Sequence, residues 1–198
     1  ARRRMAIALV LDISGSMYTF ERLDGRKTRL LEATLLAMLA LEELDAAECE
    51  WMAVGHSGSG PFAERLVEWG EPPRAEHEKL KVLRRMAAHA QYCHPGDQTF
   101  EATRLAIEAV ASRTADDRLV IVVSDADLAR YGLQPADWNR ILTSDSRVGA
   151  FAILIASHED EAERIHSELA PGRCNICTDA ARLAATFERI LISSAVTR

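Results

Sequence analysis

Four runs of apolar residues along the chain have the length of buried strands. They cover residues 4–11, 50–55, 118–123 and 148–155, and the first of them reads RMAIALVL. A run that is apolar at every position and bounded by polar residues is typical of a strand buried on both faces of a parallel sheet. Weaker patterns predict a short edge strand over residues 65–69 and a last short strand over residues 172–177.

Segments with apolar residues at helical spacing alternate with these strands. This alternation predicts an α/β fold with a doubly wound, mostly parallel central sheet that is flanked by helices and has a short antiparallel edge strand. In such sheets a ligand site lies beyond the carboxyl ends of the strands, where the strand order reverses. The predicted helices cover residues 26–44, 75–90, 99–112, 135–143, 159–169 and 179–192.

Composition narrows the class of protein. A chain of 198 residues is long enough to form one domain, residues 1–198, with a sizeable core. Its formal net charge of −6 argues against a nucleic-acid-binding surface, because such surfaces are usually basic. No apolar run approaches the ~20 residues of a membrane span, and no signal peptide is visible. We therefore predict an intracellular protein, cytoplasmic or, in a eukaryote, in the mitochondrial matrix.

The four cysteines do not form an obvious site. Cys174 and Cys177 have the CxxC spacing of zinc and redox sites. A zinc site usually needs a second ligand pair, and a redox CxxC usually opens a helix, whereas this pair lies in a predicted strand. We interpret it as structural. Cys49 and Cys93 fall at a predicted strand end and in a loop, and nothing demands an oxidising compartment.

Oxygen-bearing side chains follow two of the predicted strands. Asp12, Ser14 and Ser16 come after the first strand, Asp125 comes after the strand RLVIVVS, and Thr99 lies where a loop enters a helix. Any one of them alone would more often be a helix cap or a turn residue. Together they offer two carboxylates and three hydroxyls above one end of the sheet. Such hard ligands suit Mg²⁺, Ca²⁺ or Mn²⁺.

These residues carry a family resemblance. The stretch DISGS after a hydrophobic strand, a later loop threonine and a strand-end aspartate resemble the metal-ion-dependent adhesion site of von Willebrand factor A domains. A closer resemblance lies in DISGSMYTFERLDGRKTR, VGHSG, HAQYCHPGDQT and SDADLARYGLQP. These stretches look like the C-terminal A domain of large AAA+ ATPases distantly similar to midasin. The chain itself has no GxxxxGK[ST] loop, so we expect that it does not hydrolyse ATP by itself. Because of this resemblance, and because the chain begins without Met, we expect it to be the C-terminal part of a larger ATPase.

The resemblance implies a role for each of the five residues. Ser14, Ser16 and Thr99 would be hydroxyl ligands, direct or through water, and Asp12 and Asp125 would bind the ion directly or through water. The ligand missing from the chain would be an acidic side chain, from a partner protein or from the AAA+ modules of the same protein. The domain would thus be a non-catalytic interaction domain. With no ion bound, Asp12 and Asp125 would repel each other.

Several nearby residues compete for roles at this site. Thr103, one helical turn beyond Thr99, is a rival for its position. Asp97 is a possible outer-shell oxygen. Many family members have Gly after the strand-end aspartate, whereas this chain reads Asp125-Ala126-Asp127. We interpret Asp127 as the cap of a turn rather than as added charge beside the ion.

Two enzyme functions fit the sequence less well than an interaction domain. The stretch GHSGS at residues 55–59 nearly spells the GxSxG nucleophile elbow, but Ser59 replaces the last Gly and Gly60-Pro61 follow where a helix should begin. The alternative function is a metal-dependent phosphatase with Asp12 as the nucleophile. Such enzymes carry a second aspartate two residues later as general acid, and here that position is Ser14. The six histidines are scattered, and His77 and His89 look like surface or helix-packing residues.

Overall fold

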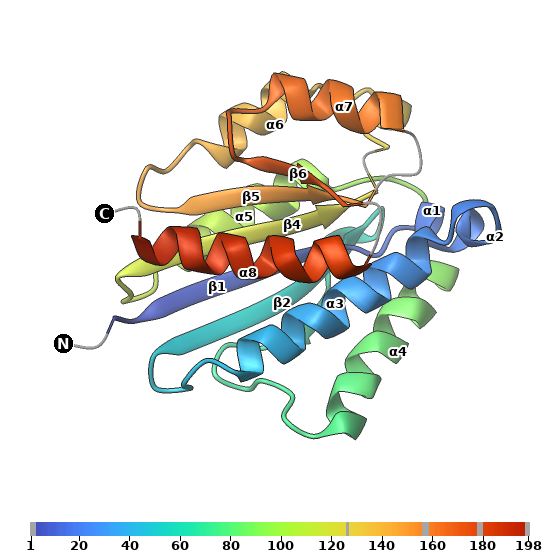
Figure 1. Ribbon diagram of the computed structural model, residues 1–198. Coiled ribbons are helices and arrows are strands. Elements are labelled where there is room, and N and C mark those ends of the chain that lie inside the picture. Colours follow the sequence, from blue (N-terminus) through green and yellow to red (C-terminus); the bar gives the residue numbers. More distant parts are fainter. Residues whose placement is uncertain (1–2, 126, 156–158, 178–179, 197–198) are drawn as a thin grey trace.

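The chain folds around one six-stranded sheet, seen in a computed structural model that describes residues 3–125, 127–155, 159–177 and 180–196 (Figure 1). The strand order is β3-β2-β1-β4-β5-β6. All neighbouring strands are parallel except β2 and β3, which pair antiparallel at one edge. The doubly wound fold with an antiparallel edge strand is thus confirmed. The strands are β1 (Met5–Asp12), β2 (Cys49–Ser57), β3 (Gly60–Val67), β4 (Asp117–Ser124), β5 (Gly149–Leu154) and β6 (Cys174–Ile176).

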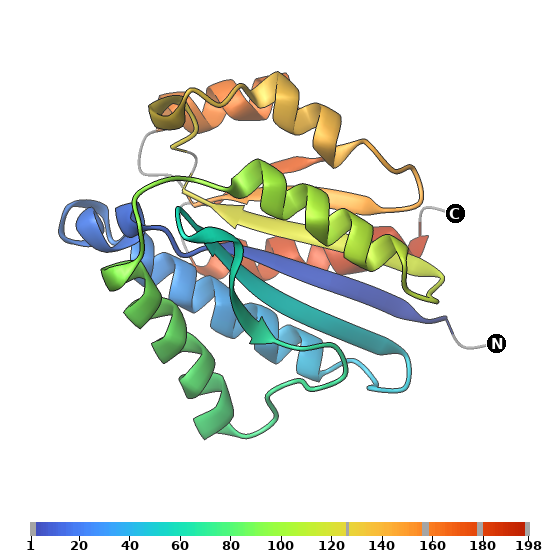
Figure 2. The same cartoon turned by 180° about the vertical axis from the view of Figure 1, so that it is seen from behind.

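Helices cover both faces of the sheet, as Figures 1 and 2 show from opposite sides. One face packs against α3 (Arg26–Glu42), α4 (Glu76–Tyr92) and α8 (Ala180–Val196). The other packs against α5 (Thr99–Ala111), α6 (Pro135–Leu142) and α7 (Glu159–Glu168). Among the described residues, no helix is both long and apolar enough to cross a membrane.

The first strand is buried on both faces, as its unbroken apolar run predicts. Ile7, Leu9 and Leu11 point into the core below α3 and α8. The alternate residues, with the alanines at positions 6 and 8, point into the core below α5. Strand β1 runs between β2 and β4 in the centre of the sheet, so its carboxyl end is enclosed by its neighbours.

The structure differs from the sequence prediction in its short elements. Strand β3 spans residues 60–67 rather than 65–69, since Pro61 is tolerated at the outer edge of a sheet. Three short helices were not predicted because they are too short to show a periodic pattern. Residue 179, where the last helix was predicted to begin, lies outside the described residues. The unpredicted helices are α1 (Gly15–Thr19), α2 (Glu21–Asp24) and the 3₁₀ helix η1 (Ala129–Tyr131).

The strand order reverses between β1 and β4, and this position locates the candidate site. Asp12 is the last residue of β1, and Asp125 directly follows β4. The two strands are hydrogen-bonded neighbours in parallel register, with Leu11 opposite Val123. Both aspartates therefore lie at the carboxyl edge of the sheet, where α1 and α2 are also found (Figure 1).

Candidate metal site

The stretch after β1 turns sharply and brings two serine hydroxyls together. The Asp12 carboxylate accepts a hydrogen bond from the Ser14 amide at 2.9 Å, which closes the turn. The side chain of Ile13 is fully buried and lies where a Cβ on Gly55 would be, only 2.3 Å from its Cδ1. This packing anchors the turn to β2. The hydroxyls of Ser14 and Ser16 then lie 2.9 Å apart.

Asp125 reaches the same cluster from β4. The Ser16 hydroxyl donates a hydrogen bond to Asp125 Oδ2 at 2.9 Å, across 109 residues of sequence. The other carboxylate oxygen, Oδ1, accepts the Asp127 amide at 3.1 Å. Hydrogen bonds therefore connect four of the five predicted ligands, and all four are buried: Asp12, Ser14, Ser16 and Asp125.

Thr99 enters from the first turn of α5. Its hydroxyl donates to Asp97 Oδ2 at 3.0 Å and lies 3.4 Å from His56 Nε2. His56 is opposite Asp12 in the parallel register of β1 and β2, so it links Thr99 to the end of β1. The rival Thr103 has a different role. Its hydroxyl donates to the Thr99 carbonyl and accepts the indole N–H of Trp138, so it braces α5 against α6.

His56 is a site residue that sequence reasoning missed. Its imidazole is fully buried, and Nδ1 has no hydrogen-bond partner among the described residues. Burial lowers the pKa of His56, although Asp97 and Asp125 oppose the shift, so the ring is neutral near pH 7. The only sequence signal was its position, one residue from the end of a strand beside β1. A neutral imidazole lines the site without adding positive charge.

Asp12 has the strongest electrostatic perturbation in the cluster. Burial raises its pKa well above the ordinary value for an aspartate, and the charges of Asp125 and Asp97 raise it further. Its Oδ2 atom is fully buried and has no hydrogen-bond partner in the described part of the chain. An unpaired buried carboxylate oxygen is costly, and a divalent cation is the ligand that would satisfy it. The residues present therefore fit a cation held by oxygen ligands.

The second residue that the sequence analysis missed is Arg26, at the start of α3. Its side chain is 6% exposed, and it donates to Asp125 Oδ2 at 2.8 Å. It also forms a forked ion pair with Asp24, in which the shortest distance is 2.6 Å. Burial disfavours its charge, but the two aspartates outweigh this effect and raise the pKa of Arg26. A permanent cation is thus built into the wall of the site.

The two other acidic residues have local roles. Asp97 accepts the amide and the hydroxyl of Thr99, so it fixes the start of α5. Asp127 forms an ion pair of 3.7 Å with Arg130. Burial and the charge of Asp125 raise the pKa of Asp127. In the described parts of the chain, no group of three or more His, Cys, Asp or Glu side chains is placed to share a metal ion. A cation here would therefore depend on the hydroxyl ligands.

A groove of about 250 Å³ borders the cluster of predicted ligands. Ser16 lies on its wall, and Tyr18 and Tyr131 line it together with Arg130. The third tyrosine of the chain, Tyr92, is 80% exposed next to the lining residues Gln91 and Cys93. Two of the three tyrosines of the chain therefore line the groove beside the candidate site. Tyrosine is enriched in protein interfaces, because one side chain offers both apolar surface and a hydrogen-bonding group.

Ser57, next to the GHSGS motif's histidine, lies in a series of polar contacts with His89 and Glu64 that has the order of a hydrolase triad. Ser57 Oγ lies 2.9 Å from His89 Nε2, and His89 Nδ1 lies 3.4 Å from Glu64. Ser57 is fully buried, however, and its hydroxyl also accepts the Ser59 amide at 3.0 Å. A nucleophile needs access to its substrate, so this series serves to join β2, β3 and α4. His89 therefore packs its helix against the sheet, as predicted.

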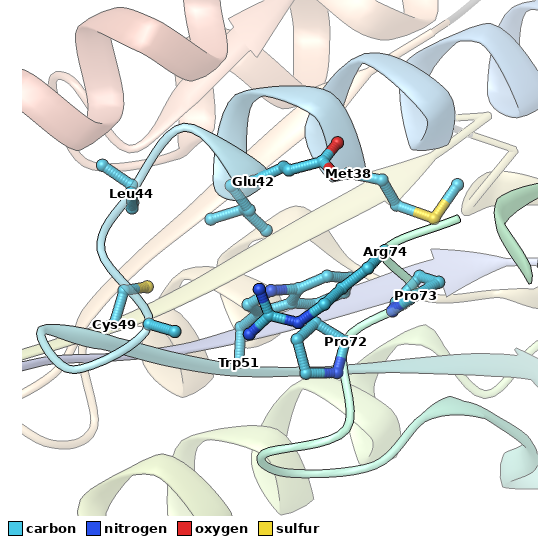
Figure 3. Close-up of a pocket in the computed structure, with 10 residues that line it drawn as sticks. Met38, Glu42, Leu44, Cys49, Trp51, Pro72, Pro73 and Arg74 are labelled. Atoms are coloured by element: carbon cyan, nitrogen blue, oxygen red, sulfur yellow. The ribbon is translucent and has the colours of Figure 1, made fainter. Parts of the chain in front are cut away.

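Two other features away from this cluster do not form ligand sites. Cys174 and Cys177 are both buried, and they belong to the cores on opposite faces of the sheet. They cannot converge on one metal ion. A second pocket lies where the end of α3, the start of β2 and the segment after β3 meet (Figure 3). With about 30 Å³ of space beside Trp51 and Arg74, it has room for little more than a water molecule.

Comparison with known proteins gives one similar sequence and several similar folds. No family model matches the chain. It is 39% identical, over 188 residues, to von Willebrand factor A domain-containing protein 8 of Mus musculus. The match covers 95% of this chain but 10% of that protein, so the chain spans about a tenth of the relative's length.

Solved structures share the fold at low sequence identity. The von Willebrand factor domain of the pili tip protein Mfa5 from Porphyromonas gingivalis matches with a TM-score of 0.63 and 12% identity, covering 100% of this chain and 98% of that one. BatB from Bacteroides thetaiotaomicron matches at 0.65 and 13%, covering 96% and 98%. The open form of the pilus adhesin SpaC from Lactobacillus rhamnosus GG matches at 0.67 and 13%, covering 97% and 30%.

Proposed function

The chain belongs to the von Willebrand factor A domains, and on this premise we propose that it is a non-catalytic interaction domain that holds its partner through a divalent cation. Domains of this family are generally metal-dependent protein-interaction modules. The ion would be held by the five residues that the sequence analysis selected: Asp12, Ser14, Ser16, Thr99 and Asp125. Mg²⁺ is our first choice, with Ca²⁺ or Mn²⁺ as alternatives, because all the ligands are hard oxygens.

One observation carries this proposal: Asp12 Oδ2 is buried and has no partner in the described part of the chain, at the turn that brings two serine hydroxyls within 2.9 Å of each other. A domain stabilised by hydrogen bonds alone would not keep a carboxylate in this position, since burial penalises its charge. A cation removes the penalty. Neutral hydroxyl ligands would leave much of the ion's charge unquenched, so the ion would still attract one more anionic oxygen.

We propose that this further oxygen belongs to an Asp or Glu of a partner. The groove beside the site, lined by Tyr18, Tyr131 and Arg130, offers a surface that other residues of the partner would contact. The partner would be another protein, or AAA+ ATPase modules of the same polypeptide if the chain is part of a longer protein like its Mus musculus relative.

The first test is a metal titration followed by melting temperature. If the cation binds only the folded domain, Mg²⁺ or Mn²⁺ should raise the melting temperature progressively, and EDTA should reverse the effect. Replacing both Ser14 and Ser16 by alanine should abolish the response. A matched control replaces Ser112 and Ser167, whose hydroxyls donate to helix carbonyls at exposed positions, and this variant should respond like the parent. A full metal response in the Ser14/Ser16 variant would refute the ligand assignment.

The interaction and phosphatase hypotheses are separated by activity and binding measurements. A partner held through the ion should co-purify with the domain in Mg²⁺ and be released by EDTA, and the Ser14/Ser16 variant should not retain it. A phosphatase would instead hydrolyse an aryl phosphate in Mg²⁺ and lose the activity in Asp12→Asn. Asp12 is fully buried, and position 14 is a serine, so we expect no such turnover.

A further inference from the structure

Arg26 connects the candidate site to the start of α3. Its guanidinium bonds two carboxylates at once, Asp24 through Nε and Nη2 and Asp125 through Nη1. The ring of Phe20 lies below it, 4.8 Å from the central guanidinium carbon. Only 6% of the Arg26 side chain is exposed, so its charge is compensated by these buried contacts and hardly by water.

Because Arg26 bonds Asp125 and not Asp12, the two aspartates of the site differ in how many of their oxygens are free to bind a cation. Asp125 Oδ2 accepts bonds from both Arg26 and Ser16, and Oδ1 accepts the Asp127 amide. Its acceptor positions are therefore largely used within the chain. Among the described residues, Asp12 has no basic partner and one of its oxygens is unpaired. A cation among the serine hydroxyls would take its direct negative charge from Asp12, while Asp125 would orient the Ser16 hydroxyl.

We infer that Arg26 is a positioning residue that holds Asp125 on Ser16 and, through its charge, weakens the site's affinity for the divalent cation. This inference rests on the proposed function. Arg26 Nη1 and the Ser16 hydroxyl both bond Asp125 Oδ2, so the guanidinium would act on a cation held by that hydroxyl in a buried region where charges are poorly screened. Such a site would bind its ion reversibly and leave part of the binding energy to the partner's acidic group.

Arg26→Gln tests the inference because it removes the charge and keeps an amide donor. Free Mn²⁺, followed by its electron paramagnetic resonance signal, gives the dissociation constant of the purified domain directly. We expect Arg26→Gln to bind Mn²⁺ about tenfold more tightly than the parent, since a repelling charge is gone. In EDTA the same variant should melt at a lower temperature, because Asp24 and Asp125 lose their partner. A residue with only a structural role would lower stability without tightening metal binding.

Asp24→Asn provides a second variant that should fold even if Arg26→Gln does not. It removes the charge of the less buried partner of the ion pair, whose side chain is 15% exposed, and leaves the charge of Arg26 less compensated, so Mn²⁺ should bind several-fold more weakly. Arg22→Gln, an exposed position on α2, is the matched control and should change the dissociation constant by less than about twofold.

The results distinguish failure of this inference from failure of the proposed function. A parent that binds Mn²⁺, together with an Arg26→Gln variant that binds equally or more weakly, overturns the inference and leaves the metal site standing. An unchanged affinity in Asp24→Asn also overturns it. A parent with no detectable Mn²⁺ binding refutes the proposed function itself.

Discussion

Gly58 and Gly96 meet backbone to backbone beside the candidate site. A Cβ added to Gly96 would lie 3.1 Å from the Cα of Gly58, and a Cβ added to Gly58 would lie 2.1 Å from the Pro95 carbonyl oxygen. The second distance is far below any normal contact. The near-match to a nucleophile elbow at residues 55–59 is thus explained by packing: Gly58 lets the loop before α5 lie against the end of β2, and this loop carries Asp97 and Thr99 into the site.

We predict that Gly58→Ala impairs metal binding through this loop. The new methyl group would meet backbone atoms of His94 and Pro95, which cannot rotate away as a side chain could. Overpacking of this kind costs about 1–3 kcal/mol of folding stability. Since the displaced loop leads into Thr99, the increase in melting temperature caused by Mg²⁺ should also shrink. Melting curves with Mg²⁺ and with EDTA measure both effects.

Gly70→Ala is the control for general destabilisation. Gly70 has a φ of 75°, so alanine is strained there, but apart from its chain neighbours no atom of the described residues lies within 4 Å of the added Cβ. This variant should lose stability and keep its full response to Mg²⁺. If both variants lose stability and respond to the metal equally, the loop contact does not position the site.

A second prediction separates Thr99 from its rival Thr103. Thr99→Ala should strongly weaken metal binding, and Thr99→Ser should largely preserve it because the hydroxyl remains. Thr103→Ala should instead cost about 1–3 kcal/mol of stability, since the buried indole N–H of Trp138 loses its acceptor. Its affinity for the metal should be close to that of the parent. Isothermal titration with Mn²⁺ and denaturant unfolding together decide the assignment; the reverse pattern would make Thr103 the ligand.

The strands and the ligand candidates were predictable because each depends on local sequence. An unbroken apolar run such as residues 5–11 predicts a buried central strand, and oxygen side chains directly after such strands lie at the carboxyl edge of the sheet. The edge strand β3 was harder, because it is only partly buried and its pattern is irregular. The turns of α1 and α2 were missed for the same reason: segments of five and four residues carry no periodicity.

The charge balance of the site was not predictable, since it depends on pairs distant in sequence. Asp125 and Arg26 are 99 residues apart, and Arg26 is one of several arginines near the first helices. The sequence predicts two carboxylates that repel each other. In the structure the buried Arg26 bonds Asp125, so the cost of burying a negative charge falls mainly on Asp12. Asp125→Asn should therefore lower the stability of the metal-free domain.

Thiol reactivity tests the interpretation of the CxxC pair. Burial raises the pKa of Cys174 to about 12 and that of Cys49 to about 11, so both are protonated thiols near neutral pH. We predict that neither reacts with iodoacetamide in the native domain at pH 7.5. Cys93, which is only partly buried, should react slowly. Mass spectrometry before and after unfolding in urea measures the labelling. Rapid modification of Cys174 in the native domain would contradict the structural interpretation and support a functional CxxC.

The last prediction concerns the charge of Asp12. In EDTA we expect Asp12→Asn to be as stable as the parent, or more stable by up to about 1 kcal/mol. Burial, and then the charges of Asp125 and Asp97, raise the pKa of this carboxyl in the folded domain. The asparagine keeps an oxygen to accept the Ser14 amide and removes the penalised charge. The same change should abolish metal binding, because it removes the carboxylate that has an unpaired oxygen.

The sign of the pH dependence follows from the same raised pKa. Between the ordinary aspartate pKa and the raised value, the folded domain holds a proton on Asp12 that the unfolded chain has released. The stability that Asp12 costs at neutral pH is therefore recovered as the pH falls through the raised pKa. In EDTA, the difference in unfolding free energy between Asp12→Asn and the parent should be largest near pH 7 and should shrink on acidification. Asp127→Asn, at a less buried position paired with Arg130, should show a smaller difference. Urea unfolding at a series of pH values measures these differences, and a parent that is more stable than Asp12→Asn in EDTA at pH 7 would show that Asp12 stabilises the fold instead of serving a cation.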